Sequence, residues 1–286
     1  MTLTSRHARG DGGRLRGTVL QGVLALIALF WLVPTFGLLI ASLREEGDNS
    51  TNGWWNALRY PAQLTFANYA TLLDNPAITG SLTNTLIITL SATLLVVGIA
   101  ALAAYAFAFL KFPGHDWIFL AVVCLLVVPV QVALIPVAKL YGALGVFGSL
   151  AGVVLFHVAF GLPFAIFLLR DCFLEIPRQL IDAARLDGAG EWRIIARVVL
   201  PLGLPAIASL GIFQFLWVWN DLLVALVFAD QSNQPITVAL QSQVRQFGAN
   251  IDVLAPGAFL SLLVPLAVFL LFQRFFVQGL MAGSVK

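Results

Sequence analysis

Charged side chains are scarce in this sequence. Only 10% of its 286 residues are Asp, Glu, Lys or Arg, whereas 60% are apolar. Soluble domains carry about 25% charged and about 45–50% apolar residues. A soluble protein of this composition would lack the polar side chains needed to cover its surface, so an ordinary soluble domain is excluded. The net charge of +2 is too small for a nucleic-acid-binding surface, and we expect no nucleic-acid partner.

Cysteine and histidine are also rare, with two and three residues respectively. Cys124 and Cys172 fit neither a metal site nor a CxxC redox pair, and we expect both to act as small apolar side chains. The three histidines lie in different segments, which argues against a membrane-embedded enzyme. No GxxxxGK[ST] sequence occurs, so the chain lacks a P-loop for ATP. No cofactor or metal is therefore predicted for this chain.

Long apolar runs are the dominant feature. A bilayer core about 30 Å thick needs roughly 20 apolar residues in a helix, and helices satisfy their own backbone hydrogen bonds inside lipid. We predict an all-α integral membrane protein with six transmembrane helices. The six runs are residues 18–43, 81–110, 116–140, 149–170, 203–229 and 255–277. The first run is too long for the apolar part of a signal peptide, so we expect it to be retained.

The placement of Lys and Arg predicts the orientation. With the N-terminus inside, twelve of the sixteen Lys and Arg residues fall in cytoplasmic segments, as the positive-inside rule requires. Both termini are then cytoplasmic. The expected segments are a cytoplasmic N-terminal segment 1–17, the first transmembrane helix 18–43, an extracytoplasmic loop 44–80, a five-helix core 81–277 that includes a cytoplasmic loop 171–202, and a cytoplasmic tail 278–286.

The loop at 171–202 combines charge with helical periodicity. Pro177 suits the first turn of a helix, and Gly188 can adopt the left-handed backbone that ends one. A second helix is expected from near Glu191. Its apolar face would consist of Trp192, Ile195 and Val199. This helix–turn–helix would lie on the inner membrane surface, either as an amphipathic connector on lipid headgroups or as the docking site of a cytoplasmic partner.

The same loop carries a gapped motif. Asp182-Ala183-Ala184, Gly188 and Val198-x-Leu200-Pro201 resemble the EAA motif of binding-protein-dependent ABC import permeases, E-A-A-x₃-G-x₉-I-x-L-P. The spacing matches throughout, with Asp182 in place of Glu and Val198 in place of Ile. The resemblance implies that a set of loop residues couples the chain to an ATPase. These residues are Asp182, Ala183, Ala184, Gly188, Leu200 and Pro201.

Other segments resemble the carbohydrate-uptake branch of this family. Trp219-Asn220-Asp221 resembles its WND signature, and residues 279–286 resemble the GLxxGAVK ending of the maltose-permease MalG type. The segment around Trp54-Trp55 is similar to alpha-glucoside permeases. The resemblance covers the chain from about residue 66 to its end, and it implies the type I ABC importer permease fold.

The resemblance also implies an assembly. The chain would form half of a translocation pore beside a second, MalF-like permease, above two copies of a cytoplasmic ATPase that binds ATP and Mg, and below an extracytoplasmic sugar-binding protein. The chain would be a non-catalytic, multi-pass subunit of the bacterial cytoplasmic membrane that imports an oligosaccharide or alpha-glucoside. The alternatives are import of a non-sugar solute and secondary transport without ATP. Secondary transport predicts repeat symmetry, which is not evident here.

Polar side chains inside the apolar runs are candidates for the pore or its gate. A charge such as Asp221 within a span usually faces protein or water. With Asn220 it could instead form a hydrogen-bonded pair that fixes the fifth helix. Trp219 could stack on a sugar ring or pack in the core. Gln131 and Gln214 could line the pore or bond to neighbouring backbone.

Overall fold

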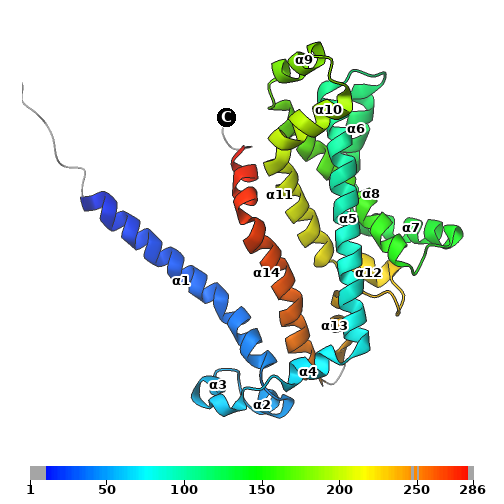
Figure 1. Ribbon diagram of the computed structural model, residues 1–286. Helices are drawn as coiled ribbons and strands as arrows, with labels where there is room; N and C mark the ends of the chain where they lie inside the picture. Colours follow the sequence, from blue (N-terminus) through cyan, green and yellow to red (C-terminus); the bar gives the residue numbers. More distant parts are fainter. Residues whose placement is uncertain (1–10, 246–247, 250, 283–286) are drawn as a thin grey trace, which may run out of the picture. The chain divides into compact units, whose positions relative to one another are not determined.

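The computed structural model describes residues 11–245, 248–249 and 251–282. It divides into two compact units, one formed by residues 1–72 and 246–259 and the other by residues 73–245 and 260–286. Helices make up most of the chain (Figure 1). The expected N-terminal segment 1–17 and the tail 278–286, with its GLxxGAVK-like ending, lie partly outside the described residues.

The first unit begins with the long helix α1 (Asp11–Ser42). Its apolar side chains, such as Phe30 and Trp31, are largely exposed, as expected for a helix that faces lipid. The segment after α1 is not an open loop but a series of short helices. They are α2 (Glu46–Thr51), α3 (Asn56–Arg59), the 3₁₀ helix η1 (Pro61–Gln63) and α4 (Ala67–Leu73).

A buried arginine holds this series together. Arg44 is fully buried, and its guanidinium donates to the carbonyl oxygens of Asp48 at 3.0 Å and Asn52 at 3.2 Å. Asn68 of α4 donates to the Arg44 carbonyl at 2.7 Å. The two guanidinium bonds offset part of the cost of burying this side chain, whose Nε has no hydrogen-bond partner among the described residues.

The second unit contains most of the helices. They are α5 (Pro76–Phe109), α6 (His115–Leu125), α7 (Val130–Leu144), α8 (Leu150–Leu174), α9 (Arg178–Leu186), α10 (Glu191–Ile194), the π-helical η2 (Ile195–Val199), α11 (Leu200–Trp219), α12 (Leu223–Phe228) and α13 (Ile236–Ser242). Strands β1 (Val244–Arg245) and β2 (Gly248–Ala249) and helix α14 (Ile251–Ala282) are divided between the two units.

The core of the second unit lies where α5 packs along α8 and α11. Ala92, Val96, Ala100 and Ala104 recur every four residues on α5 and are fully buried. Small side chains on one helical face let helices approach closely, which is how membrane helices associate in the absence of a hydrophobic driving force.

The described residues include five helices that are long and apolar enough to cross a membrane, or six spans if the bent pair α6–α7 is one of them. The predicted all-α membrane architecture is therefore confirmed. The runs 18–43, 81–110, 149–170 and 255–277 each correspond to a single helix, namely α1, α5, α8 and α14.

The predicted third span, 116–140, is wrong as a continuous helix. Helix α6 ends at Leu125, α7 begins at Val130, and the two axes differ by 102°. Pro129 lies at the start of α7 in an extended conformation. Because proline lacks an N–H and its ring clashes with a preceding helical turn, the chain breaks here and restarts.

The predicted fifth span, 203–229, also differs from the structure at both ends. The helical path starts earlier, since α10, η2 and α11 form one continuous run, Glu191–Trp219. It also stops earlier, at Trp219, and the short helix α12 follows as a separate element. The second helix expected within the loop is thus the beginning of this long helix.

Candidate functional site

The motif-bearing loop folds as a short helix followed by a tight turn. Helix α9 starts directly after Pro177, and Gly188 closes the turn with a φ of +75°. The N–H of Gly188 donates to the Arg185 carbonyl at 3.0 Å, and the N–H of Ala189 donates to the Ala184 carbonyl at 3.0 Å. These paired bonds form a Schellman motif. A Cβ at Gly188 would meet no described atom within 4 Å, so glycine is needed for its backbone conformation rather than for space.

The loop has one buried and one exposed face. Ile181 of α9 and Ile194 of α10 are fully buried and anchor the loop to the rest of the unit. On the outer face Leu186 is 90% exposed and Trp192 is 73% exposed, beside the exposed Asp182 and Ala183. Exposed apolar side chains grouped with polar ones mark a surface that contacts another protein or lipid.

An ion pair joins the two sides of the turn. Arg185 donates from Nε to Glu191 Oε1 at 3.0 Å and from Nη2 to Oε2 at 3.1 Å. Tyr105 of α5 donates its hydroxyl to the same carboxylate, and Asp182 Oδ1 lies 3.7 Å from Arg185 Nη1. Sequence reasoning missed the role of Tyr105, because 86 residues separate it from Glu191 and no local signal connects them.

The last two motif residues, Leu200 and Pro201, begin α11. The five preceding residues, Ile195–Val199, form a π-helical turn. A proline inside a helix removes one hydrogen bond and crowds the carbonyl four residues before it, and a π turn widens the helix at this place. Leu200 is half-buried and Pro201 is exposed; both belong to α11, whereas Asp182 belongs to α9 and Gly188 to the turn after it.

Asp221 lies in the break between α11 and α12 and determines where α12 starts. Its Oδ1 accepts from the N–H of Val224 at 3.3 Å, and its Oδ2 accepts from the N–H of Ala225 at 3.0 Å. Its carbonyl accepts from the Thr237 hydroxyl at 2.6 Å. A carboxylate near the first turn of a helix satisfies N–H groups that have no partner within the helix.

His157 of α8 faces this carboxylate. The ring is fully buried; its Nδ1 lies 2.9 Å from the Val153 carbonyl, and its Nε2 lies 3.6 Å from Asp221 Oδ2. A carbonyl only accepts, so Nδ1 must be the donor and Nε2 points at the carboxylate. The two side chains thus form a polar contact within an otherwise apolar packing region.

A very small cavity adjoins this contact. Its volume is about 10 Å³, and Thr85 and Thr89 of α5 line it together with His157 and Asp221. Such a volume holds about one water molecule and is far too small for a sugar ring. Thr85 also accepts from the N–H of Ile236 at 2.8 Å. Sequence reasoning missed both threonines, since hydroxyls in an apolar helix usually bond to their own backbone.

The remaining pore candidates do not converge on one site. Trp219 is fully buried, and its Nε1 donates to the Ser261 carbonyl of α14 at 3.0 Å, while the exposed Asn220 bonds to Leu216 of its own helix. Gln214 is buried and its Nε2 has no hydrogen-bond partner among the described residues. Gln131 is exposed near the start of α7.

Residues 96–281 match the family described as binding-protein-dependent transport system inner membrane component. The osmoprotective compounds uptake permease protein GgtD of Synechocystis sp. is 46% identical over 265 residues, which cover 91% of this chain and 89% of that protein. The alpha-glucoside transport system permease protein AglG of Rhizobium meliloti is 42% identical over 255 residues, covering 87% and 67%.

A solved structure shows the same fold. One chain of a bacterial ABC transporter involved in the import of the acidic polysaccharide alginate matches with a TM-score of 0.77 at 20% identity, over 96% of this chain and 100% of that chain. The resemblance to sugar ABC permeases noted in the sequence is confirmed by these relatives. The chain is a permease component, and it belongs to the family of binding-protein-dependent transport system inner membrane components.

Proposed function

We propose that this permease forms half of the translocation pore of an ATP-driven sugar importer, and that α9 with its turn couples the pore to a cytoplasmic ATPase. The outer face of the loop supports this role most directly. The E-A-A-x₃-G spacing puts Asp182 and Ala183 on an exposed surface, and the Gly188 turn holds that surface in a defined shape.

The distribution of charge supports the orientation that coupling requires. Twelve of the sixteen Lys and Arg residues fall on one side when both termini are placed in the cytoplasm. In this topology α9 faces the cytoplasm, where the proposed partners are two copies of an ATPase that binds ATP and Mg. The other proposed partners are a second, MalF-like permease and an extracytoplasmic sugar-binding protein.

We assign the conformational response to the residues at the far end of the long helix. The run Glu191–Trp219 begins at the turn and ends beside Asn220 and Asp221. A displacement of α9 therefore reaches these residues along a single helix. Trp219 and Gln214 lie in its packed interior and would move with it, whereas Gln131 is on α7 and would belong to another part of the pore wall.

The substrate class is proposed from the named functions of relatives. AglG is named for alpha-glucoside transport, and this supports an alpha-glucoside or a related oligosaccharide. GgtD is named for the uptake of osmoprotective compounds, which supports an osmoprotective solute as a second candidate. Melting temperatures of the cognate binding protein with each ligand would distinguish them, because only a bound ligand stabilises the folded state.

Gly188→Asp tests the coupling role. Any side chain makes a φ of +75° less favourable than it is for glycine, and Asp also adds a negative charge to the outer face of the turn. We expect normal membrane insertion and assembly but a loss of substrate-driven uptake and of binding-protein-stimulated ATP hydrolysis in proteoliposomes. Gly190→Asp is the matched control, since Gly190 has an ordinary extended backbone before α10, a position that favours Asp. Unchanged uptake by the Gly188 variant would disprove the coupling role.

A further inference from the structure

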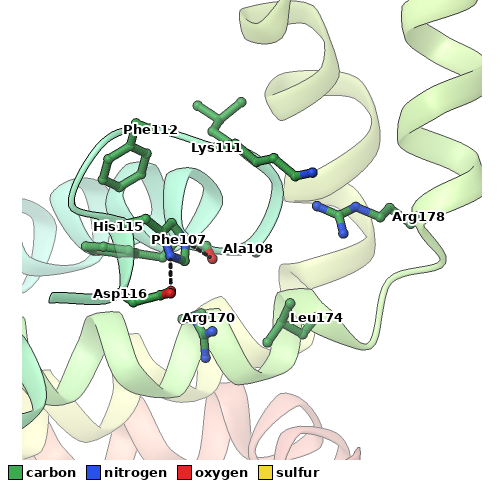
Figure 2. A pocket seen from close by; sticks show the side chains of 10 residues that line it. Phe107, Ala108, Lys111, Phe112, His115, Asp116, Arg170, Leu174 and Arg178 are labelled. Atoms are coloured by element: carbon green, nitrogen blue, oxygen red, sulfur yellow. Dashed lines mark hydrogen bonds and ion pairs between the residues drawn. The ribbon is translucent and has the colours of Figure 1, made fainter. Parts of the chain in front are cut away.

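A basic pocket lies where α5 ends, α6 begins and α8 leads into α9. Its volume is about 370 Å³. Three cationic side chains line it, namely Lys111 from the α5–α6 turn, Arg170 from α8 and Arg178 from the first position of α9. Figure 2 shows Lys111 and Arg178 pointing toward each other.

Cations outnumber carboxylates around this pocket, since an adjoining cavity of about 390 Å³ is lined by Lys111, Arg178 and Arg185 and by one carboxylate, Asp182. None of the three cations that line the pocket itself forms an ion pair with a carboxylate among the described residues, and Arg170 Nε is buried without a hydrogen-bond partner in the same part of the chain. Like charges brought together repel, most strongly where the medium is less polar than water. The arrangement therefore favours an anion that the chain itself does not supply.

The one carboxylate that lines the pocket, Asp116, is already engaged. Its Oδ1 lies 2.8 Å from His115 Nδ1, and His115 Nε2 lies 3.0 Å from the Phe107 carbonyl. Asp116 is thus paired with His115, and among the described residues it forms no ion pair with Lys111, Arg170 or Arg178.

The pocket also has apolar lining residues. Leu174 and Phe112 line it, and the Arg170 guanidinium lies over the Phe119 ring at 4.1 Å. Trp117, in the first turn of α6, is 78% exposed. Tryptophan is enriched at the level where lipid headgroups meet the hydrocarbon core.

We propose that this pocket binds the phosphate headgroup of an anionic phospholipid. Arginine offers a planar pair of donors that matches phosphate oxygens, and lysine adds a point charge. Basic pockets between transmembrane helices are the kind of site that anionic headgroups occupy. An acidic protein segment would match the charges but would leave the apolar side chains of Leu174 and Phe112 uncovered, whereas an acyl chain would cover them.

Lipid binding would have a structural effect on the loop. Arg178 is the first residue of α9, while Lys111 and Arg170 belong to the α5–α6 turn and to α8. A phosphate bonded to all three would tie the start of α9 to these two elements. This binding goes beyond the proposed transport function, and it can be tested without any transport measurement.

The test uses the complete transporter, purified in detergent and analysed by native mass spectrometry. We expect the wild type to retain phosphatidylglycerol over phosphatidylcholine by about tenfold or more, since charge-assisted hydrogen bonds are each worth roughly that factor. The double variant Lys111→Gln/Arg178→Gln changes two exposed side chains and should lose this preference. Arg170→Gln should lose it as well. The double variant Arg59→Gln/Lys139→Gln, with two exposed cations outside the pocket, should keep it.

Three results would overturn the proposal. The first is an unchanged lipid preference in both pocket variants. The second is competition by inorganic phosphate at the same concentration as phosphatidylglycerol, which would assign the pocket to free anions. The third is retention of the lipid by the permease pair but not by the transporter with its ATPase, which would assign the pocket to a protein interface.

Discussion

Arg185 and Glu191 form a bidentate ion pair across the Gly188 turn, with N–O distances of 3.0 and 3.1 Å. The pair connects α9 to the first turn of the long helix Glu191–Trp219. The hydrogen bonds to Glu191 raise the pKa of Arg185 above its ordinary value. A cation with a raised pKa contributes its stabilisation at every pH below the ordinary value, so the Arg185 charge does not limit the pair in the physiological range.

Glu191→Gln should weaken this connection without unfolding the protein. Arg185 and Glu191 are 34% and 44% exposed, and pairs of that kind contribute less than about 1 kcal/mol because water and salt screen them. We expect a nearly unchanged melting temperature, together with a clear loss of coupling between ATP hydrolysis and uptake. The ratio of substrate imported to ATP hydrolysed in proteoliposomes measures it.

Tyr105→Phe is the control for that variant. It removes one hydroxyl bond to the same carboxylate but leaves both bonds from Arg185. We expect coupling close to the wild-type value and a stability loss of about 1 kcal/mol, the usual cost of one hydrogen bond. Coupling that stays at the wild-type value in Glu191→Gln as well as in Tyr105→Phe would show that the ion pair is not needed.

Asp221→Ala should destabilise the junction between α11 and α12. The change leaves the N–H groups of Val224 and Ala225 without the carboxylate that accepts from them, at a cost of about 1–3 kcal/mol. Asp221→Asn keeps one accepting oxygen for one of the two N–H groups, so its cost should be smaller than that of the Ala variant. Thermal unfolding in detergent measures both, and Asn220→Ala, at an exposed neighbour, is the control. Equal melting temperatures for the Ala and Asn variants would contradict the capping role.

Gly203→Ala should disturb the packing of α11 on α8. A Cβ at Gly203 would lie 2.6 Å from the Phe173 ring, and Phe173 is fully buried, so the ring has no free space to enter. Overpacking of this kind costs about 1–3 kcal/mol. Gly98→Ala on α5 meets no described atom within 4 Å and should stabilise by up to about 1 kcal/mol through helix propensity. Melting temperatures that shift in the same direction for both variants would refute this account.

Trp219→Phe should cost more than Trp217→Phe. Trp219 is fully buried, and its indole N–H donates to the carbonyl of the half-buried Ser261, so the change removes the donor of this bond at a cost of about 1–3 kcal/mol. Trp217 is 40% exposed and should change stability by less than about 1 kcal/mol. The difference in free energy of unfolding, measured in one detergent, checks this, and a larger effect at Trp217 would count against the role given to Trp219.

Local backbone chemistry was predictable from the sequence. Pro177 and Gly188 have conformational requirements of their own, and the structure places them at the start of α9 and at its closing turn. Long apolar runs were equally informative, because the cost of transfer into lipid depends on composition. Runs 81–110 and 149–170 therefore correspond to α5 and α8.

The interruptions in the spans were not predictable in the same way. Hydropathy averages over about twenty residues and carries no information on direction, so it cannot detect the 102° bend after Leu125. The break after Trp219 depends on Asp221 bonding to the start of α12 and to Thr237. The Tyr105–Glu191 bond likewise joins residues that only the packing of α5 brings together.

In the proposed coupling, the continuous helical run from Glu191 to Trp219 carries a displacement from the loop to the other end of α11. The 29 residues of this run extend about 40 Å at 1.5 Å per residue, with the ion pair at one end and Asp221 just beyond the other. A tilt of about 5° about the first end carries the second by roughly 3 to 4 Å over that length. This displacement is as long as the 3.6 Å distance between His157 Nε2 and Asp221 Oδ2. In the proposed coupling, a small tilt of the helix at the loop would therefore separate these two side chains.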